Sequence, residues 1–269
     1  MTKEIKFYSE LANQILHKNT DYFKDKQIIK KIFSSNGEDH QEIIRLRLTI
    51  IDSYYSTNMS RRYYGIENIS KQIFDHYKDD QSLKNDLLSF INEPLNNVMI
   101  RDIFNKPYGI SKGGEPKGKA MSLISKYAYF LTDFQFPIYD SIVFETYQKI
   151  TNRFPELGLN MKLSTEISDF VRIMNLLNKS SKINDFDKLD NLLWLIGKIL
   201  RGNFSLILNE ATYKEFVKPI DKDSKTLSKD IDKKIREHSF LNLDKLKHLI
   251  DDDLYTMISF AKEINNYTA

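Results

Sequence analysis

The sequence lacks cysteine and has few glycine, proline and histidine residues. The absence of cysteine excludes disulfides, thiolate catalysis, zinc–cysteine sites and cysteine-ligated iron–sulfur clusters. Nine glycines and six prolines among 269 residues suit long helices joined by short loops. The five histidines are scattered without metal-ligand spacing, so we expect neither a metal site nor a cofactor.

Long apolar runs are also missing. No run reaches the roughly 18 residues that a membrane span requires. The N-terminal residues (M-T-K-E-I-K-F-Y) lack the apolar core of a signal peptide. We therefore expect a soluble, cytoplasmic protein without a membrane partner, and the sequence leaves its oligomeric state open.

Positive charge is concentrated locally rather than overall. The net charge is only +3, which is compatible with nucleic acid but does not require it. Between residues 101 and 126, however, there are six basic residues and only two acidic ones, and this segment contains a loop rich in glycine and lysine. The residues of this loop that we single out are Lys112, Gly113, Gly114, Lys117 and Gly118. Glycine N–H groups and lysines commonly hold phosphate, although a solvated loop has the same composition.

Apolar residues recur with helical period along most of the chain, and no series of strands is apparent. The pattern predicts helices over residues 3–18, 22–33, 40–53, 66–77, 82–92, 95–104, 119–131, 141–153, 164–178 and 185–200. We therefore expect an all-α fold. Residues 1–204 would form one helical domain with its core at about 40–204, followed by a charged linker and a helical appendage over 205–269.

Residues 119–143 combine a buried helix, an aromatic loop and an aspartate that opens a second helix. At 100° per residue, the polar residues of the first helix share one side, and they are Lys119, Ser122, Lys126 and Tyr129. This spacing favours a solvated stripe over the alternative, the polar wall of a cleft. Asp140 is a good N-cap for the second helix, and a carboxylate fixed there is also well placed for chemistry.

Adjacent arginines and tyrosines occur at residues 61–64 (Arg-Arg-Tyr-Tyr). Arginine can grip a phosphate and tyrosine can stack on a base. The more frequent alternative is a pair of exposed arginines packed on half-buried rings.

The order of these parts resembles the helix–hairpin–helix DNA glycosylases, the superfamily of endonuclease III and 8-oxoguanine glycosylases. The resemblance covers roughly residues 40–200. Its motifs are a polar stretch (Ser53, Ser56, Thr57, Asn58), the glycine–lysine loop before a buried helix, the P-I-Y-D sequence at 137–140, and L-D-x-x-L-W-x-x-G at 189–197. Three positions depart from the family: the L-P-G-x-G hairpin is replaced by P-K-G-K-A at 116–120, Tyr55 stands about where a glutamine is common, and Ile142 stands where a histidine often follows the aspartate.

The resemblance implies roles for two side chains. Asp140 matches the catalytic aspartate, whose carboxylate stabilises the oxocarbenium-like sugar or places the nucleophile. Lys119 occupies the type of position from which the lysine of bifunctional members attacks C1′ and forms a Schiff base. Ser122 could fall in that slot instead, which would imply a monofunctional enzyme. Lys126 lies two turns into the helix, too deep for the slot.

The expected function is therefore that of a DNA glycosylase-like protein that cleaves the N-glycosidic bond of a damaged or modified base. DNA contacts are expected at Arg61, Arg62, Lys112, Gly113, Gly114, Lys117 and Gly118. A flipped base needs a pocket and stacking partners, and the candidates are Ser122, Tyr55, Asn58, Phe136 and Tyr139. The alternatives are a non-catalytic helical protein of a mobile element or defence system that binds nucleic acid or a partner, and a helical interaction protein without nucleic acid.

Overall fold

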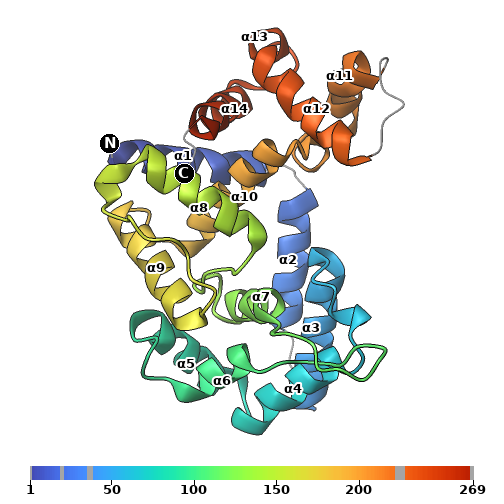
Figure 1. The fold of residues 1–269 in the computed structure, drawn as a ribbon, viewed down its shortest axis with the longest axis vertical. Coiled ribbons are helices and arrows are strands. Elements are labelled where there is room, and N and C mark those ends of the chain that lie inside the picture. Colours follow the sequence, from blue (N-terminus) through green and yellow to red (C-terminus); the bar gives the residue numbers. More distant parts are fainter. Residues whose placement is uncertain (1, 19–20, 35–38, 222–227, 267–269) are drawn as a thin grey trace. The chain divides into compact units, whose positions relative to one another are not determined.

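The computed structural model describes residues 2–18, 21–34, 39–221 and 228–266, and it is built from helices (Figure 1). In these residues β pairing is limited to isolated bridges, which join Tyr63 to Ile110, Pro107 to Lys119 and Ile110 to Pro116. The prediction of an all-α fold is confirmed. Helices form because apolar residues recur on one face of each segment and are buried there.

The chain folds into two compact units, and each is made of separate stretches of sequence. The first unit contains residues 1–24, 141–162 and 178–269, and the second contains residues 25–140 and 163–177. Residue 204, after which we expected a domain boundary, lies inside the first unit. The described residues of 205–269 therefore group with the N-terminal helix rather than forming a unit of their own.

In the first unit, α10 is the central helix and packs against α1, α8 and α14. Its helices are α1 (Thr2–His17), α8 (Ser141–Arg153), α10 (Phe186–Arg201), α11 (Glu210–Asp221), α12 (Ser228–Leu241), α13 (Leu243–Leu246) and α14 (Asp252–Asn265), with the 3-10 turns η2 (Pro155–Leu157) and η3 (Phe204–Leu206). Asp185 caps α10 by accepting hydrogen bonds from the backbone N–H groups of Asp187 and Lys188. Gly202 ends it with a φ of +77°.

In the second unit, α7 is the central helix and packs against α3, α5 and α6. The helices of this unit are α3 (His40–Tyr55), α4 (Gly65–His76), α5 (Asp80–Asn92), α6 (Val98–Asn105) and α7 (Met121–Leu131), with the 3-10 turn η1 (Met59–Arg61); most of α2 (Asp21–Phe33) and of α9 (Ile167–Ser180) belongs to it as well. The residues of α7 from Leu123 to Leu131 are all buried, including Lys126 and Tyr129. The prediction that the polar side of this helix is exposed to solvent is therefore wrong at these two positions.

Three helices, α6, α7 and α9, begin two or three residues later than the apolar pattern predicted. α6 starts at Val98 because Asn97 caps it, with the Ile100 N–H donating to the Asn97 side chain at 3.0 Å. α7 starts at Met121 because the preceding Lys119 is held in an isolated β-bridge to Pro107.

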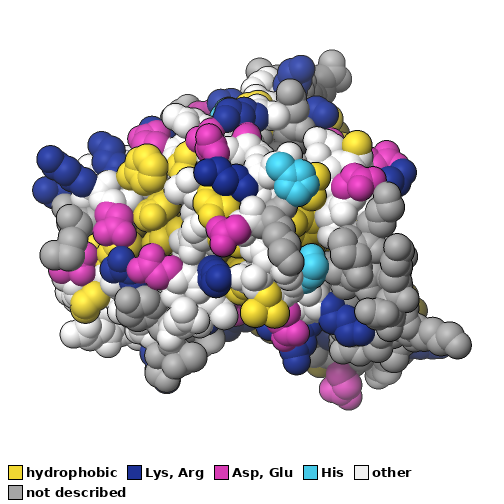
Figure 2. Space-filling view, turned by 90° about the horizontal axis from the view of Figure 1, so that it is seen from above, with side chains coloured by type: hydrophobic (Ala, Val, Ile, Leu, Met, Phe, Trp, Pro, Cys, Tyr) yellow, Lys and Arg dark blue, Asp and Glu magenta, His cyan; other side chains and the backbone are white. Residues whose placement is uncertain are grey.

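Charges of both signs lie interspersed on the face drawn in Figure 2. This agrees with the nearly balanced total of 40 basic and 37 acidic residues. A functional surface must therefore be sought in local groups of charge. No described helix combines the length and the apolar composition needed to cross a bilayer.

Candidate nucleic-acid interface and carboxylate cluster

The glycine- and lysine-rich loop before α7 folds into an irregular hairpin. The Ser111 N–H donates to the Glu115 carbonyl at 2.8 Å, and the Lys117 N–H donates to the Gly109 carbonyl at 2.9 Å. Gly114 turns the chain with a φ of +85°. The hairpin members that we singled out are all exposed, and they are Lys112, Gly113, Gly114, Lys117 and Gly118.

This hairpin is paired to the segment that carries the adjacent arginines and tyrosines. Tyr63 and Ile110 exchange backbone hydrogen bonds of 3.1 and 3.0 Å. The Arg62 guanidinium donates to the Gly118 carbonyl at 2.6 Å and to the Lys119 carbonyl at 3.4 Å. The structure thus joins two segments that sequence analysis had singled out separately.

The paired segments present cationic and aromatic side chains to solvent. Tyr63 and Tyr64 are 55% and 64% exposed, which is unusual for large rings. We call this group the cationic hairpin surface, and it consists of Arg61, Arg62, Tyr63, Tyr64, Lys112 and Lys117. One carboxylate, that of Glu115, is exposed on the same hairpin.

The segment that leads into this surface has a strained backbone. Ser56, Asn58 and Tyr64 adopt left-handed conformations with φ of 49°, 62° and 60°. Such residues cost on the order of 1–3 kcal/mol each and cluster at functional sites. The buried Asp52 carboxylate holds the segment by accepting hydrogen bonds from the Met59 N–H at 2.8 Å and from the Thr57 hydroxyl.

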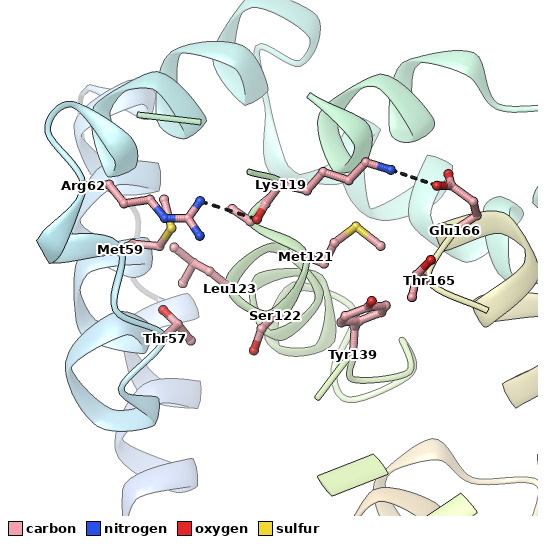
Figure 3. Close-up of a pocket in the computed structure, with 11 residues that line it drawn as sticks. Thr57, Met59, Arg62, Lys119, Met121, Ser122, Leu123, Tyr139, Thr165 and Glu166 are labelled. Carbon is pink, nitrogen blue, oxygen red and sulfur yellow. Dashed lines mark hydrogen bonds and ion pairs between the residues drawn. The ribbon is translucent and has the colours of Figure 1, made fainter. Parts of the chain in front are cut away.

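A cavity of about 480 Å³ lies beside the strained segment and the end of the hairpin (Figure 3). Its polar lining residues are Thr57, Arg62, Lys119, Ser122, Tyr139, Thr165 and Glu166, and Met59, Met121 and Leu123 supply apolar wall. All of them belong to the second unit.

Lys119 lines this cavity, and its amine makes two hydrogen bonds within the protein. Its Nζ donates to Asn105 Oδ1 at 2.8 Å and to Glu166 Oε1 at 3.0 Å, and Figure 3 shows the side chain extending toward Glu166. Burial raises the pKa of Tyr139 above its usual value, and the nearby Glu166 carboxylate raises it further. Tyr139 therefore stays a neutral phenol that can donate a hydrogen bond.

Asp140 is paired with Lys126 rather than with Lys119. The Lys126 Nζ donates to Asp140 Oδ2 at 2.8 Å and to Ser122 Oγ at 2.8 Å. The Asp140 side chain is 30% exposed, and that of Lys126 is 3% exposed. The Tyr139 N–H donates to Ser125 Oγ at 2.9 Å, which fixes the loop before Asp140 against α7. We call Ser122, Lys126 and Asp140 the carboxylate cluster.

Sequence reasoning missed Lys126 as a partner of Asp140, although it placed the lysine correctly as deep in the helix. The available signal was the i, i+4 spacing of Ser122 and Lys126 on the polar side of α7. The contact with Asp140 spans 14 residues and depends on how the intervening loop folds back.

Of the five candidates for a base pocket, Ser122 and Tyr139 line the cavity. Phe136 is fully buried, with its ring 6.5 and 5.7 Å from the rings of Phe90 and Phe104, so it belongs to the core and cannot stack on a base. The Tyr55 ring lies 5.5 Å from the Lys126 ammonium. Asn58 is exposed, and its amide donates to the Ser56 carbonyl at 3.0 Å.

Within the described part of the chain, no group of three or more His, Asp or Glu side chains is placed to hold a metal ion.

No protein-family model, curated protein or solved structure matches this chain. Its function is therefore inferred from the geometry of the site.

Proposed function

We propose that this protein binds DNA through the cationic hairpin surface and cleaves the N-glycosidic bond of a damaged or modified base. The observation that carries the proposal is the pairing of the Tyr63 segment with the glycine–lysine hairpin, which gathers cations and exposed rings beside a cavity. The carboxylate cluster reaches that cavity through Ser122.

Binding to DNA follows from the chemistry of the cationic hairpin surface. Lysine and arginine side chains that neutralise phosphates release counterions, which favours association at low salt. Gly114 and Gly118 have open space where a side chain would be, so a phosphate can approach their backbone closely. Tyr63 and Tyr64 offer exposed rings on which an unpaired base can stack.

Cleavage of a glycosidic bond leaves positive charge on the sugar, and a nearby carboxylate stabilises it. Asp140 suits this role because its carboxylate is partly exposed and is held by a hydrogen bond from Lys126. The cavity volume of about 480 Å³ falls in the range of roughly 300–1,000 Å³ found for small-molecule sites, so a single extruded nucleoside is a ligand of suitable size.

The proposal is tested with a panel of duplexes that each carry one oxidised, alkylated, deaminated or abasic site. We expect salt-sensitive binding to all of them and release of at least one altered base under single-turnover conditions. Borohydride trapping on abasic DNA shows whether an amine such as that of Lys119 forms a Schiff base. Absence of base release from every duplex of the panel would overturn the proposal, whether or not the protein binds DNA.

A second candidate function is nucleic-acid binding without base removal. This function is favoured because both predicted catalytic side chains already make hydrogen bonds within the protein. Lys119 donates to Asn105 and Glu166, and Asp140 accepts from Lys126. This alternative predicts the same salt-sensitive binding with no product from any duplex of the panel. Product formation therefore separates the two functions.

A further inference from the structure

We infer that Lys126 is a positioning residue, a buried ammonium group that holds the Asp140 carboxylate and turns the Ser122 hydroxyl toward the cavity. The inference rests on the proposed function and assigns Lys126 a part in the same reaction. Its basis is the geometry of the carboxylate cluster.

Lys126 is buried, and burial of a charge is costly. A buried ammonium group is tolerated when its charge and its donors are matched. Here the Nζ makes two hydrogen bonds of 2.8 Å, to Asp140 and Ser122, and lies 5.5 Å from the Tyr55 ring. Because only 3% of the side chain is exposed, solvent does not compete for these contacts as it does at a surface ion pair.

Two contacts hold the Asp140 carboxylate in place. The Lys126 ammonium fixes the carboxylate on one side, and the loop that carries it is tied to α7 by the Tyr139–Ser125 hydrogen bond. A carboxylate that stabilises a developing positive charge acts best when its orientation is set before the reaction. With 30% of its side chain exposed, Asp140 stays reachable while Lys126 does not.

The hydrogen bond from Lys126 also limits the direction of the Ser122 hydroxyl. An ammonium group only donates hydrogen bonds, so Ser122 Oγ accepts from Lys126 and must point its own hydrogen elsewhere. Ser122 lines the cavity, which places that hydrogen where an acceptor atom of a ligand can receive it. The cluster thus recognises a carbonyl or phosphate oxygen through Ser122.

These contacts imply that Lys126 acts through its neighbours. A side chain that is 3% exposed does not touch a bound ligand, whereas the Asp140 side chain, at 30% exposed, is accessible. Its removal should therefore slow base release without weakening the contact between DNA and the cationic hairpin surface.

The test compares two lysines that are buried in the same unit. Lys126→Met removes the ammonium from the cluster, and Lys26→Met removes one that lies 5.0 Å from the Tyr129 and Phe134 rings, outside the cluster. Single-turnover base release and the Kd for DNA are measured for both. We expect release to slow by about 100-fold or more in Lys126→Met, with the Kd unchanged. In Lys26→Met we expect release within about 3-fold of the unmutated protein.

Double mutants identify the groups through which Lys126 acts. Because the three residues form one unit, the effects of Lys126→Met and Asp140→Asn on the release rate should be far from additive. Ser122→Ala should slow single-turnover release in the unmutated background and have less effect when Lys126 is already replaced. A merely structural loss would lower the active fraction and leave the rate of the remaining active protein unchanged.

Lys126→Gln keeps a hydrogen-bond donor and replaces Lys126→Met in the test if the methionine variant does not fold. We expect Lys126→Gln to release base at a rate between those of Lys126→Met and the unmutated protein. Normal release by a folded Lys126 variant, or full additivity with Asp140→Asn, would overturn the inference alone. Absence of release by the unmutated protein would overturn the proposed function and this inference together.

Discussion

At the scale of single residues, the chemistry of the candidate site lies in contacts that the sequence shows only in part. The spacing of Ser122 and Lys126 was visible as a polar side of α7. That this side faces Asp140 was not visible, because the contact depends on the hydrogen bond of the Tyr139 N–H to the buried Ser125 hydroxyl. Serine at a buried helix position carries no sequence signal for such a partner.

Gly109 is the residue on which the pairing of the hairpin depends most directly. Its φ is +71°, and a Cβ atom there would lie 2.9 Å from the Tyr63 carbonyl and 2.9 Å from the Arg62 Cβ. Gly109→Ala should therefore destabilise the protein by about 1–3 kcal/mol and weaken DNA binding. Chemical denaturation and a binding titration measure the two effects.

The control for this variant is Gly113→Ala in the same hairpin, where the nearest atom to a new Cβ would be Ser111 Oγ at 3.8 Å. We expect this control to change stability by less than about 0.5 kcal/mol. Equal behaviour of the two alanine variants would show that the close approach of Gly109 to Tyr63 does not hold the hairpin.

At the scale of elements, helices were predictable where a polar cap precedes a clear apolar period. α5 and α10 follow Asp79 and Asp185, which accept backbone hydrogen bonds at the helix start. The hairpin before α7 was predicted as a loop only, because its pairing uses isolated bridges and glycine turns without strand alternation. Its partner, Tyr63, lies 47 residues before Ile110 in the chain and could not be deduced from local pattern.

The two exposed lysines of the hairpin lead to a prediction about the salt dependence of DNA binding. Lys112 and Lys117 are exposed, so Lys112→Ala and Lys117→Ala should leave the fold unchanged. Each variant should weaken DNA binding and reduce the slope of log K against log salt concentration by about 1 per lost phosphate contact. Fluorescence anisotropy over a series of salt concentrations gives both quantities.

Lys262→Ala on α14, an exposed lysine of the other unit, is the matched control and should keep the slope of the unmutated protein. If the hairpin variants also keep that slope, the phosphate contacts lie elsewhere and the cationic hairpin surface is not the DNA interface.

At the scale of the whole molecule, the all-α class follows from helical periodicity, whereas the division into two units does not. The sequence after residue 204 contains a stretch rich in charged residues, which suggested a domain boundary. The tertiary contacts place no boundary between the two units at that position. Both units contain segments distant in sequence, so only tertiary contacts such as those of α1 with α10 define them.

Buried tyrosines in both units predict a loss of stability at high pH. Burial raises the pKa of Tyr147 to about 12, and burial with the Asp86 carboxylate raises the pKa of Tyr77 still further. The unfolded chain, with a tyrosine pKa near 10, then loses these protons first. The free energy of unfolding is therefore unaffected by these groups below about pH 10 and falls as the pH rises above it.

Thermal unfolding from about pH 8 to about pH 11 checks this expectation. Tyr147→Phe cannot ionise and should lose stability less steeply above about pH 10 than the unmutated protein. An identical decline in the two proteins would mean that Tyr147 is ionised as readily in the folded state as in the unfolded chain.

The most direct measurement is single-turnover base release by the Asp140→Asn variant beside its affinity for the same duplex. Asparagine keeps the shape of the side chain and removes the negative charge that would stabilise the sugar cation. We predict release slower by about 100- to 1,000-fold with an unchanged Kd. Release at the rate of the unmutated protein would contradict a role for the Asp140 carboxylate in the reaction.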